Sequence, residues 1–323
     1  MIASDSTGGT SQRSGNSPVL FFDFLSLIKH WKIYNDDKDV AYRLFISIGY
    51  QHIVPYLLFL RKTRIRGGHS ISELELLITL EREMSNLILN EIGLIEHQVK
   101  TRFAYGIQAV HGDNGLYNPE NFKHKREHKQ GLFSIQRELE RQKKWRTNTS
   151  SVPASTWVSL EYATLGAVSR LLNNVRSKEV VQCVSDSFSV NNRCLRNWAR
   201  YIALIRNACA HFEPFIVRPQ APIVPKGIYG FEKKDPTKPL YALLVIERLL
   251  QGRIWAGIEG AKDDYYNFVY DTTIAFSEFA EANPALAKKL CIPRKYLAAQ
   301  GMKRLHHIVL RHGTAECKYY LAA

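Results

Sequence analysis

One short segment of the chain carries side chains that could cleave a phosphodiester bond. Arg206, Asn207 and His211 form an RNxxxH pattern. A neutral imidazole can take the proton of a ribose 2′-hydroxyl, whose oxygen then attacks the adjacent phosphate. A guanidinium can stabilise the charge that grows on the phosphate oxygens, and an amide can orient the imidazole or hold one of those oxygens. The pattern indicates a catalytic site for RNA that needs no metal and no cofactor, and that leaves DNA uncut because DNA lacks the 2′-hydroxyl.

The geometry of this pattern depends on the helix that carries it. The sequence predicts a helix over 193–212, ended by Pro214. On a regular helix, side chains five residues apart point about 140° away from each other. Arg206 and His211 therefore converge only if the last turn tightens or bends, or if the partner group comes from a second copy of the chain. Both alternatives stay open.

Spacing alone is weak evidence for a site. Arg64 and His69 have the same separation, but they flank a Gly-Gly loop in which no helix can hold them together, so we interpret that pair as chance. Basic groups at the end of a helix can also simply cap its carbonyls and complement its dipole. The RNxxxH segment needs support from the rest of the chain.

The charge of the chain supplies some of that support. Lys and Arg number 44 against 30 Asp and Glu, a formal net charge of +14 and a pI near 9.5. Such an excess attracts polyanions, most commonly nucleic acid, and an anionic membrane surface is the competing interpretation. Two segments concentrate the charge, and aromatic residues that could stack on unpaired bases lie in or beside both. Residues 123–146 hold nine Lys and Arg against three Glu, and residues 288–318 hold eight against one.

From these segments and the central helix we predict a set of RNA-binding residues. They are Lys123, Lys125, Arg126, Lys129, Arg141, Lys143, Lys144, Arg146, Arg102, Lys303 and Arg304.

Helical periodicity dominates the elements that must position these groups. Apolar residues recur at three- and four-residue spacing over 71–110, with Ser70 or Ser72 as the cap and Glu73 in the first turn. The other expected helices lie at 18–34, 39–61, about 122–146, 155–176, 193–212, 240–260, 262–282 and 293–311. The predicted fold class is all-α.

Composition divides the chain into four parts. Residues 1–17 are predicted to be a disordered tail, 18–218 the main helical domain, 219–239 a Pro-rich linker, and 240–323 a smaller, basic helical module. No apolar stretch approaches the roughly 20 residues of a spanning helix, and no signal peptide is visible, so we expect a cytoplasmic protein without a membrane segment. The five cysteines form no CxxC pair and are expected to be reduced packing residues rather than zinc ligands.

Four segments resemble one family in the same order. Residues 204–211 resemble the RNxxxH signature of the HEPN superfamily, in the form seen in Abi-like (AbiD/AbiF) abortive-infection proteins. Residues 42–56 resemble its Y-x-x-x-x-Y-x-x-P-F region, 95–122 its central helix and turn, and 157–169 its P-W-x-x-x-E-x-x-S-F-G-x-x-S stretch. After the His, family members often have another His and an N-R-x-W segment, whereas Phe-Glu-Pro-Phe follows here.

The resemblance implies a HEPN-type helical bundle and toxin-like RNA cleavage in phage defence. It implies that Arg206 and His211 are catalytic, that Asn207 supports them, and that Glu96 and Arg102 on the central helix face the same cleft. It also implies a homodimer, because HEPN sites form where two copies of the motif face each other, and a possible complex with a structured non-coding RNA.

Two other functions compete with a ribonuclease. The chain could hold a guide or antitoxin RNA without cutting it, and activity that requires both Arg206 and His211 would separate these alternatives. A helical adaptor on an anionic membrane surface is the third. Glu161 is as well suited to a structural ion pair with Arg170 or Arg200 as to a catalytic role.

Overall fold

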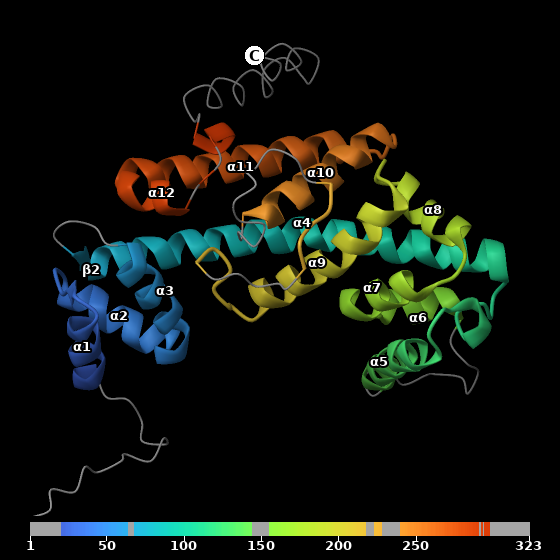
Figure 1. Ribbon diagram of the computed structural model, residues 1–323, viewed down its shortest axis with the longest axis horizontal. Helices are drawn as coiled ribbons and strands as arrows, with labels where there is room; N and C mark the ends of the chain where they lie inside the picture. Colours follow the sequence, from blue (N-terminus) through green and yellow to red (C-terminus); the bar gives the residue numbers. More distant parts are fainter. Residues whose placement is uncertain are drawn as a thin grey trace, which may run out of the picture. The chain divides into compact units, whose positions relative to one another are not determined.

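The computed structural model describes residues 21–63, 68–143, 155–217, 223–227, 240–290, 292 and 294–297. The chain forms two compact units, residues 1–75 and residues 76–323 (Figure 1). Regular structure in the described residues is helical apart from one parallel pair of two-residue strands. The predicted all-α class is therefore confirmed. None of the helices in the described ranges is long and apolar enough to cross a membrane.

The N-terminal unit has more breaks than the sequence predicts. It contains α1 (Phe21–His30), β1 (Ile33–Tyr34), α2 (Lys38–Ile48), α3 (Tyr50–Thr63) and β2 (His69–Ser70). The expected helix over 18–34 is wrong beyond His30, where Lys32 takes a positive φ of 60° and the chain turns into β1. The expected helix over 39–61 is divided because Gly49, with φ 74°, ends α2.

His69 has a structural role in this unit. Its ring is buried and lies 2.9 Å from both Thr63 Oγ1 and Glu73 Oε2. His69 therefore connects the end of α3 to the beginning of the next helix. Arg64 lies outside the described residues, so the interpretation of the Arg64–His69 spacing stays a prediction.

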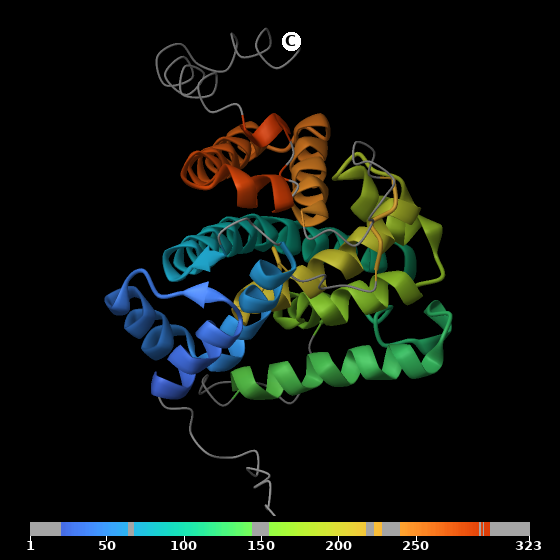
Figure 2. The ribbon, with the colours of Figure 1, turned by 60° about the vertical axis from the view of Figure 1, so that its left-hand side comes forward.

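The long helix α4 (Ile71–His111) agrees with the predicted 71–110 to within one residue. Ser70 and Glu73 form a capping box: the Ser70 hydroxyl accepts from the Glu73 N–H, and the Glu73 carboxylate accepts from the Ser70 N–H. Leu87 of the predicted apolar stripe is half-buried, and the other side chains of that stripe are buried: Leu74, Leu77, Ile78, Leu80, Met84, Ile88, Ile92, Ile95 and Val99. Figures 1 and 2 show α4 running between α10–α12 on one side and α5–α7 with α9 on the other.

The remaining elements of the second unit connect these layers. They are η1 (Pro119–Asn121), α5 (Lys125–Lys143), α6 (Thr156–Tyr162), α7 (Leu165–Asn174), α8 (Lys178–Asp186), α9 (Asn192–Ala210), α10 (Tyr241–Trp255), α11 (Ala261–Ala282), α12 (Pro284–Leu290) and η2 (Arg294–Leu297). The expected helix over 155–176 is divided at Ala163 and Thr164, and the Thr164 side chain caps α7. Helix α8 was not expected from the sequence.

Several predicted features fall where the structure is not described. Lys144, Arg146, Lys303 and Arg304 lie outside the described residues, as does most of the helix expected at 293–311. The predicted boundaries at 17, 218 and 239 stay predictions.

Candidate functional site

Helix α9 positions the RNxxxH segment. The Asn191 side chain accepts from the Cys194 N–H and starts the helix. One face of α9 is buried along a three-and-four-residue stripe, formed by Leu195, Trp198, Ile202, Ile205 and Cys209. This packing leaves the opposite face, which carries Arg200 and Asn207, open to solvent.

The end of α9 keeps a regular course. The helix is α through Ala210, and the backbone N–H of His211 still bonds to the Asn207 carbonyl at 3.0 Å. The chain then closes as a Schellman motif, in which the N–H of Phe212 bonds to the Cys209 carbonyl and that of Glu213 to the Ala208 carbonyl. Phe212 takes the left-handed position with φ 53°, where glycine is usual, and the residue is 62% exposed.

The side chains of the motif lie at this open end. Asn207 and His211 are exposed and Arg206 is half-buried, with Arg206 Nη1 3.5 Å from Asn207 Oδ1. Because α9 does not tighten before Ala210, the expected separation of about 140° between Arg206 and His211 persists within one chain. This favours the second alternative, in which the partner group comes from another copy.

The segment after the motif is anchored to α4. The buried carboxylate of Glu81 accepts from the backbone N–H of Phe215 and that of Ile216, each at 2.9 Å. Burial raises the pKa of the Cys209 thiol to about 12. Cys209 is free, buried and protonated near neutral pH, so this cysteine of the motif is a packing residue rather than a nucleophile.

A cleft of about 430 Å³ opens beside the motif, between α5, α7 and α9. Its lining consists mainly of polar and basic side chains together with a few small or apolar ones: Glu127, Gln130, Gly166, Ser169, Arg170, Asn173, Arg200, Ala203, Leu204 and Asn207. Arg170 and Arg200 are exposed and make no ion pair with an acidic residue in the described ranges. Sequence reasoning did not find this cleft, although the seven-residue spacing of Arg200 and Asn207 places both on one helix face.

The cleft borders a second group of cations at the end of α7. The Arg196 guanidinium donates to the carbonyls of Leu172, Asn173 and Val175, which caps that helix. The pKa of Lys123 is lowered, mainly by desolvation and to a smaller extent by the positive charges of Arg196 and Arg176. These three like charges lie close enough to repel, and a bound anion would relieve that repulsion.

Within the described ranges, the predicted RNA-binding residues lie on two helices and in the turn before α5. Lys123 precedes α5, while Lys125, Arg126, Lys129 and Arg141 lie on it, and all are exposed. Two of them have acidic neighbours: Lys125 pairs with Glu120 at 2.5 Å and Arg141 with Glu138 at 3.3 Å. Arg102 is exposed on α4. The backbone of Lys143 ends α5, and its side chain lies outside the described part of the chain.

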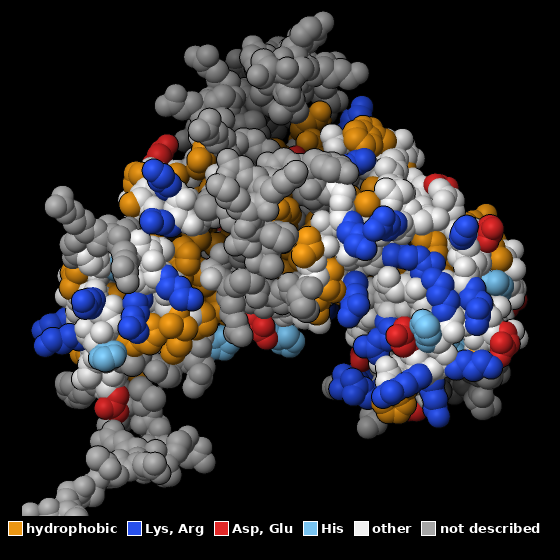
Figure 3. Space-filling view, viewed as in Figure 1, with side chains coloured by type: hydrophobic (Ala, Val, Ile, Leu, Met, Phe, Trp, Pro, Cys, Tyr) orange, Lys and Arg blue, Asp and Glu red, His pale blue; other side chains and the backbone are white. Residues whose placement is uncertain are grey.

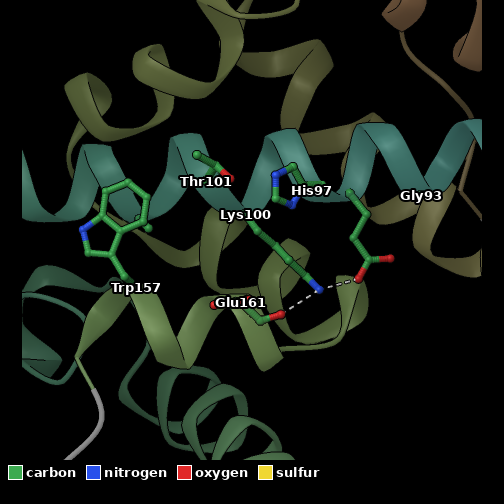
Figure 4. A pocket seen from close by; sticks show the side chains of 8 residues that line it. Gly93, His97, Lys100, Thr101, Trp157 and Glu161 are labelled. Carbon is green, nitrogen blue, oxygen red and sulfur yellow. Dashed lines mark hydrogen bonds and ion pairs between the residues drawn. The ribbon is translucent and has the colours of Figure 1, made fainter. Parts of the chain in front are cut away.

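A separate cavity of about 390 Å³ lies between α4 and α6 (Figure 4). Glu96 pairs with Lys100 at 2.7 Å, and Lys100 Nζ also donates to the Glu161 backbone carbonyl at 3.3 Å. Glu161 lines this cavity, and the ion pair with Arg170 or Arg200, one of the two roles weighed for Glu161, does not occur among the described side chains. Glu96 therefore faces α6 rather than the cleft beside the motif, and Arg102 is not among the residues that line either space.

Comparison with known proteins gives one match. A family model described as Abi-like protein matches residues 43–216, slightly more than half of the chain. No curated protein and no solved structure matches the chain. The matched span includes all of α9 and ends at the residue whose N–H is held by Glu81.

Proposed function

The chain belongs to the Abi-like protein family, and from that membership we propose that it is an RNA-binding protein of abortive-infection defence whose RNxxxH segment cleaves RNA without a metal ion. The proposal includes a HEPN-type site formed by two copies of the chain, and a structured non-coding RNA as a possible partner. The observation that carries it is the position of Arg206, Asn207 and His211. They lie at the solvent-exposed end of α9, inside the family match and beside a cleft that two arginines line.

The reaction needs only a base, a stabilised phosphate and an acid. The His211 imidazole takes the proton of a ribose 2′-hydroxyl, and the 2′-oxygen forms a bond to the adjacent phosphorus. The bond from phosphorus to the 5′-oxygen breaks, and that oxygen takes up a proton from an imidazolium or from water. Arg206 stabilises the phosphate oxygens while negative charge accumulates on them. The products are a 2′,3′-cyclic phosphate and a free 5′-hydroxyl.

A single substrate series tests this chemistry. Purified full-length protein is incubated with a single-stranded RNA oligonucleotide, with the same oligonucleotide carrying one 2′-deoxy nucleotide at the mapped cut, and with DNA. We expect cleavage of the RNA only, ending in a cyclic phosphate, because the attacking oxygen is absent from the other two. His211→Ala and Arg206→Ala are each expected to lower the rate by at least about 100-fold.

The control is His52→Ala, which removes an exposed histidine of α3 and should leave the rate unchanged. Equal activity of His211→Ala and the unsubstituted protein would overturn the catalytic assignment. Tight RNA binding without any cleavage by the unsubstituted protein would instead favour the alternative function, an Abi-like protein that uses the same surface to hold RNA.

A further inference from the structure

The exposed face of α9 forms a line of polar groups that ends at His211. Arg200 and Asn207 are seven residues apart and so differ by only about 20° around the helix, and His211 follows Asn207 by one turn. Arg196, which precedes Arg200 by one turn, is held against the end of α7 by its carbonyl contacts. The four residues share one side of the helix over about four turns.

Helix α7 completes one wall of the cleft with a second free guanidinium. Arg170 lines the same space as Arg200, and both are exposed. The only acidic side chain in the lining is Glu127 of α5, and it forms no ion pair in the described ranges with either arginine. Two unpaired guanidiniums beside the amide side chains of Gln130 and Asn207 form a donor-rich surface suited to phosphate and sugar oxygens. The amide nitrogen of Asn173 donates to the backbone carbonyls of Ser169 and Arg196 and holds α7 against α9.

The surroundings extend this surface in one direction. Lys123, Arg176 and Arg196 lie close together near the end of α7 that carries Asn173, another lining residue. Figure 3 shows Lys and Arg side chains gathered over the part of the second unit where Figure 1 labels α5–α8. A polyanion could contact this basic area and the cleft at once.

We propose that the α5–α7–α9 cleft binds the sugar–phosphate backbone of the RNA strand and directs it along α9 to His211. Arg170 and Arg200 contact phosphates away from the cut, and Asn207 lies between them and the reacting group. Arg200 and His211 are about 16 Å apart along the helix axis, so the arginines are positioning residues and not catalytic ones. This inference rests on the proposed function and assigns the substrate path of that site.

Binding and cleavage measured separately test the cleft. Fluorescence anisotropy with a labelled, non-cleavable RNA that carries a 2′-deoxy nucleotide measures the affinity of the protein for RNA. The same oligonucleotide with all of its 2′-hydroxyls measures the rate of cleavage. Arg170→Glu and Arg200→Glu should each weaken binding by about tenfold or more and reduce the slope of log affinity against log salt by about one. Arg200→Lys should retain most of the affinity. Arg82→Glu, on the exposed side of α4, makes the same charge change outside the cleft and should have a smaller effect.

The outcomes separate the cleft from the catalytic centre. His211→Ala should bind RNA as tightly as the unsubstituted protein while losing cleavage. If Arg170→Glu and Arg200→Glu bind like Arg82→Glu, the cleft proposal is overturned even when His211 proves catalytic. If these variants lose RNA binding and the parent protein does not cleave RNA, the binding role of the cleft is supported and the ribonuclease activity is not. Should a Glu variant melt at a lower temperature than the parent, Arg170→Gln and Arg200→Gln provide the same comparison without charge reversal.

Discussion

Phe212 has a strained backbone conformation at the end of the helix that carries the candidate site. It occupies the left-handed position of the Schellman motif that ends α9, and its ring is exposed, so buried packing does not offset the backbone cost. A left-handed conformation costs an L-residue roughly 1–2 kcal/mol relative to glycine. Strain of this kind persists at functional sites when the conformation places a group where it is needed.

We expect Phe212→Gly to stabilise the protein by about 1 kcal/mol, because glycine adopts this φ without a steric penalty. Urea unfolding followed by circular dichroism would measure the change. Phe212→Ala is the matched control, since it removes the ring but keeps the Cβ, and it should give no such gain. A destabilised Phe212→Gly would show that the ring makes contacts that outweigh the strain. A gain in stability combined with a loss of RNA cleavage would assign the ring to the substrate.

At the scale of the elements, α10 packs unusually close to the turn between α8 and α9. A Cβ added to Gly252 would lie 1.7 Å from the Phe188 carbonyl oxygen, and the obstructing atoms belong to the backbone. The adjacent Arg253 is buried, donates to Gln98 of α4 and pairs with Asp264 of α11 at 2.7 Å. Gly252 therefore lies at a junction of helices that cannot shift independently.

Gly252→Ala should cost more than about 3 kcal/mol, because backbone atoms have to move to admit the methyl group. The measurement is thermal unfolding by calorimetry. Gly93→Ala is a sharp control: Gly93 lies in α4 with nothing within 4 Å of the added Cβ, so alanine should stabilise that helix by up to about 1 kcal/mol. Equal effects of the two substitutions would contradict the close approach of α10.

The elements that the sequence predicts best are those whose own side chains determine them. Helices α4 and α9 have long apolar stripes and side-chain caps, and both were expected within one or two residues of their ends. The missed features depend on single backbone conformations or on neighbours. Gly49 divides one expected helix through its positive φ, and α8 is short, with few repeats of its apolar pattern.

The same distinction holds for the candidate site. The RNxxxH residues are adjacent in sequence, so their common position at the end of α9 could be predicted. The cleft requires Glu127 of α5, Arg170 of α7 and Arg200 of α9 to meet, and only tertiary packing brings them together. The sequence suggests Arg170 and Arg200 only as alternative ion-pair partners of Glu161, which instead lines the cavity between α4 and α6.

At the scale of the whole chain, the positive charge is unevenly distributed. Helix α5 carries six Lys and Arg against three Glu, whereas α11 carries five Asp and Glu against one Lys. A nonspecific attraction to polyanions would not require the basic residues to be concentrated on some helices and the acidic residues on others. The concentration of basic groups on the helices beside the RNxxxH segment favours an RNA partner that is oriented toward that segment.

Two copies are needed if the catalytic pair cannot form within one chain. In a two-fold dimer the Arg206 of each copy would act with the His211 of the other, giving two equivalent pairs. A mixed dimer of one Arg206→Ala copy and one His211→Ala copy retains one intact pair, because the first supplies its His and the second its Arg. Co-expression with two different affinity tags and sequential purification isolates this mixed dimer.

We expect the mixed dimer to cleave RNA at about half the rate of the unsubstituted dimer, while each single-variant dimer is inactive. Inactive mixed dimers would place Arg206 and His211 in the same chain's active site, and would require the end of α9 to bend on binding RNA. A single-species mass equal to one chain at micromolar concentration, with full activity, would remove the dimer from the proposal altogether.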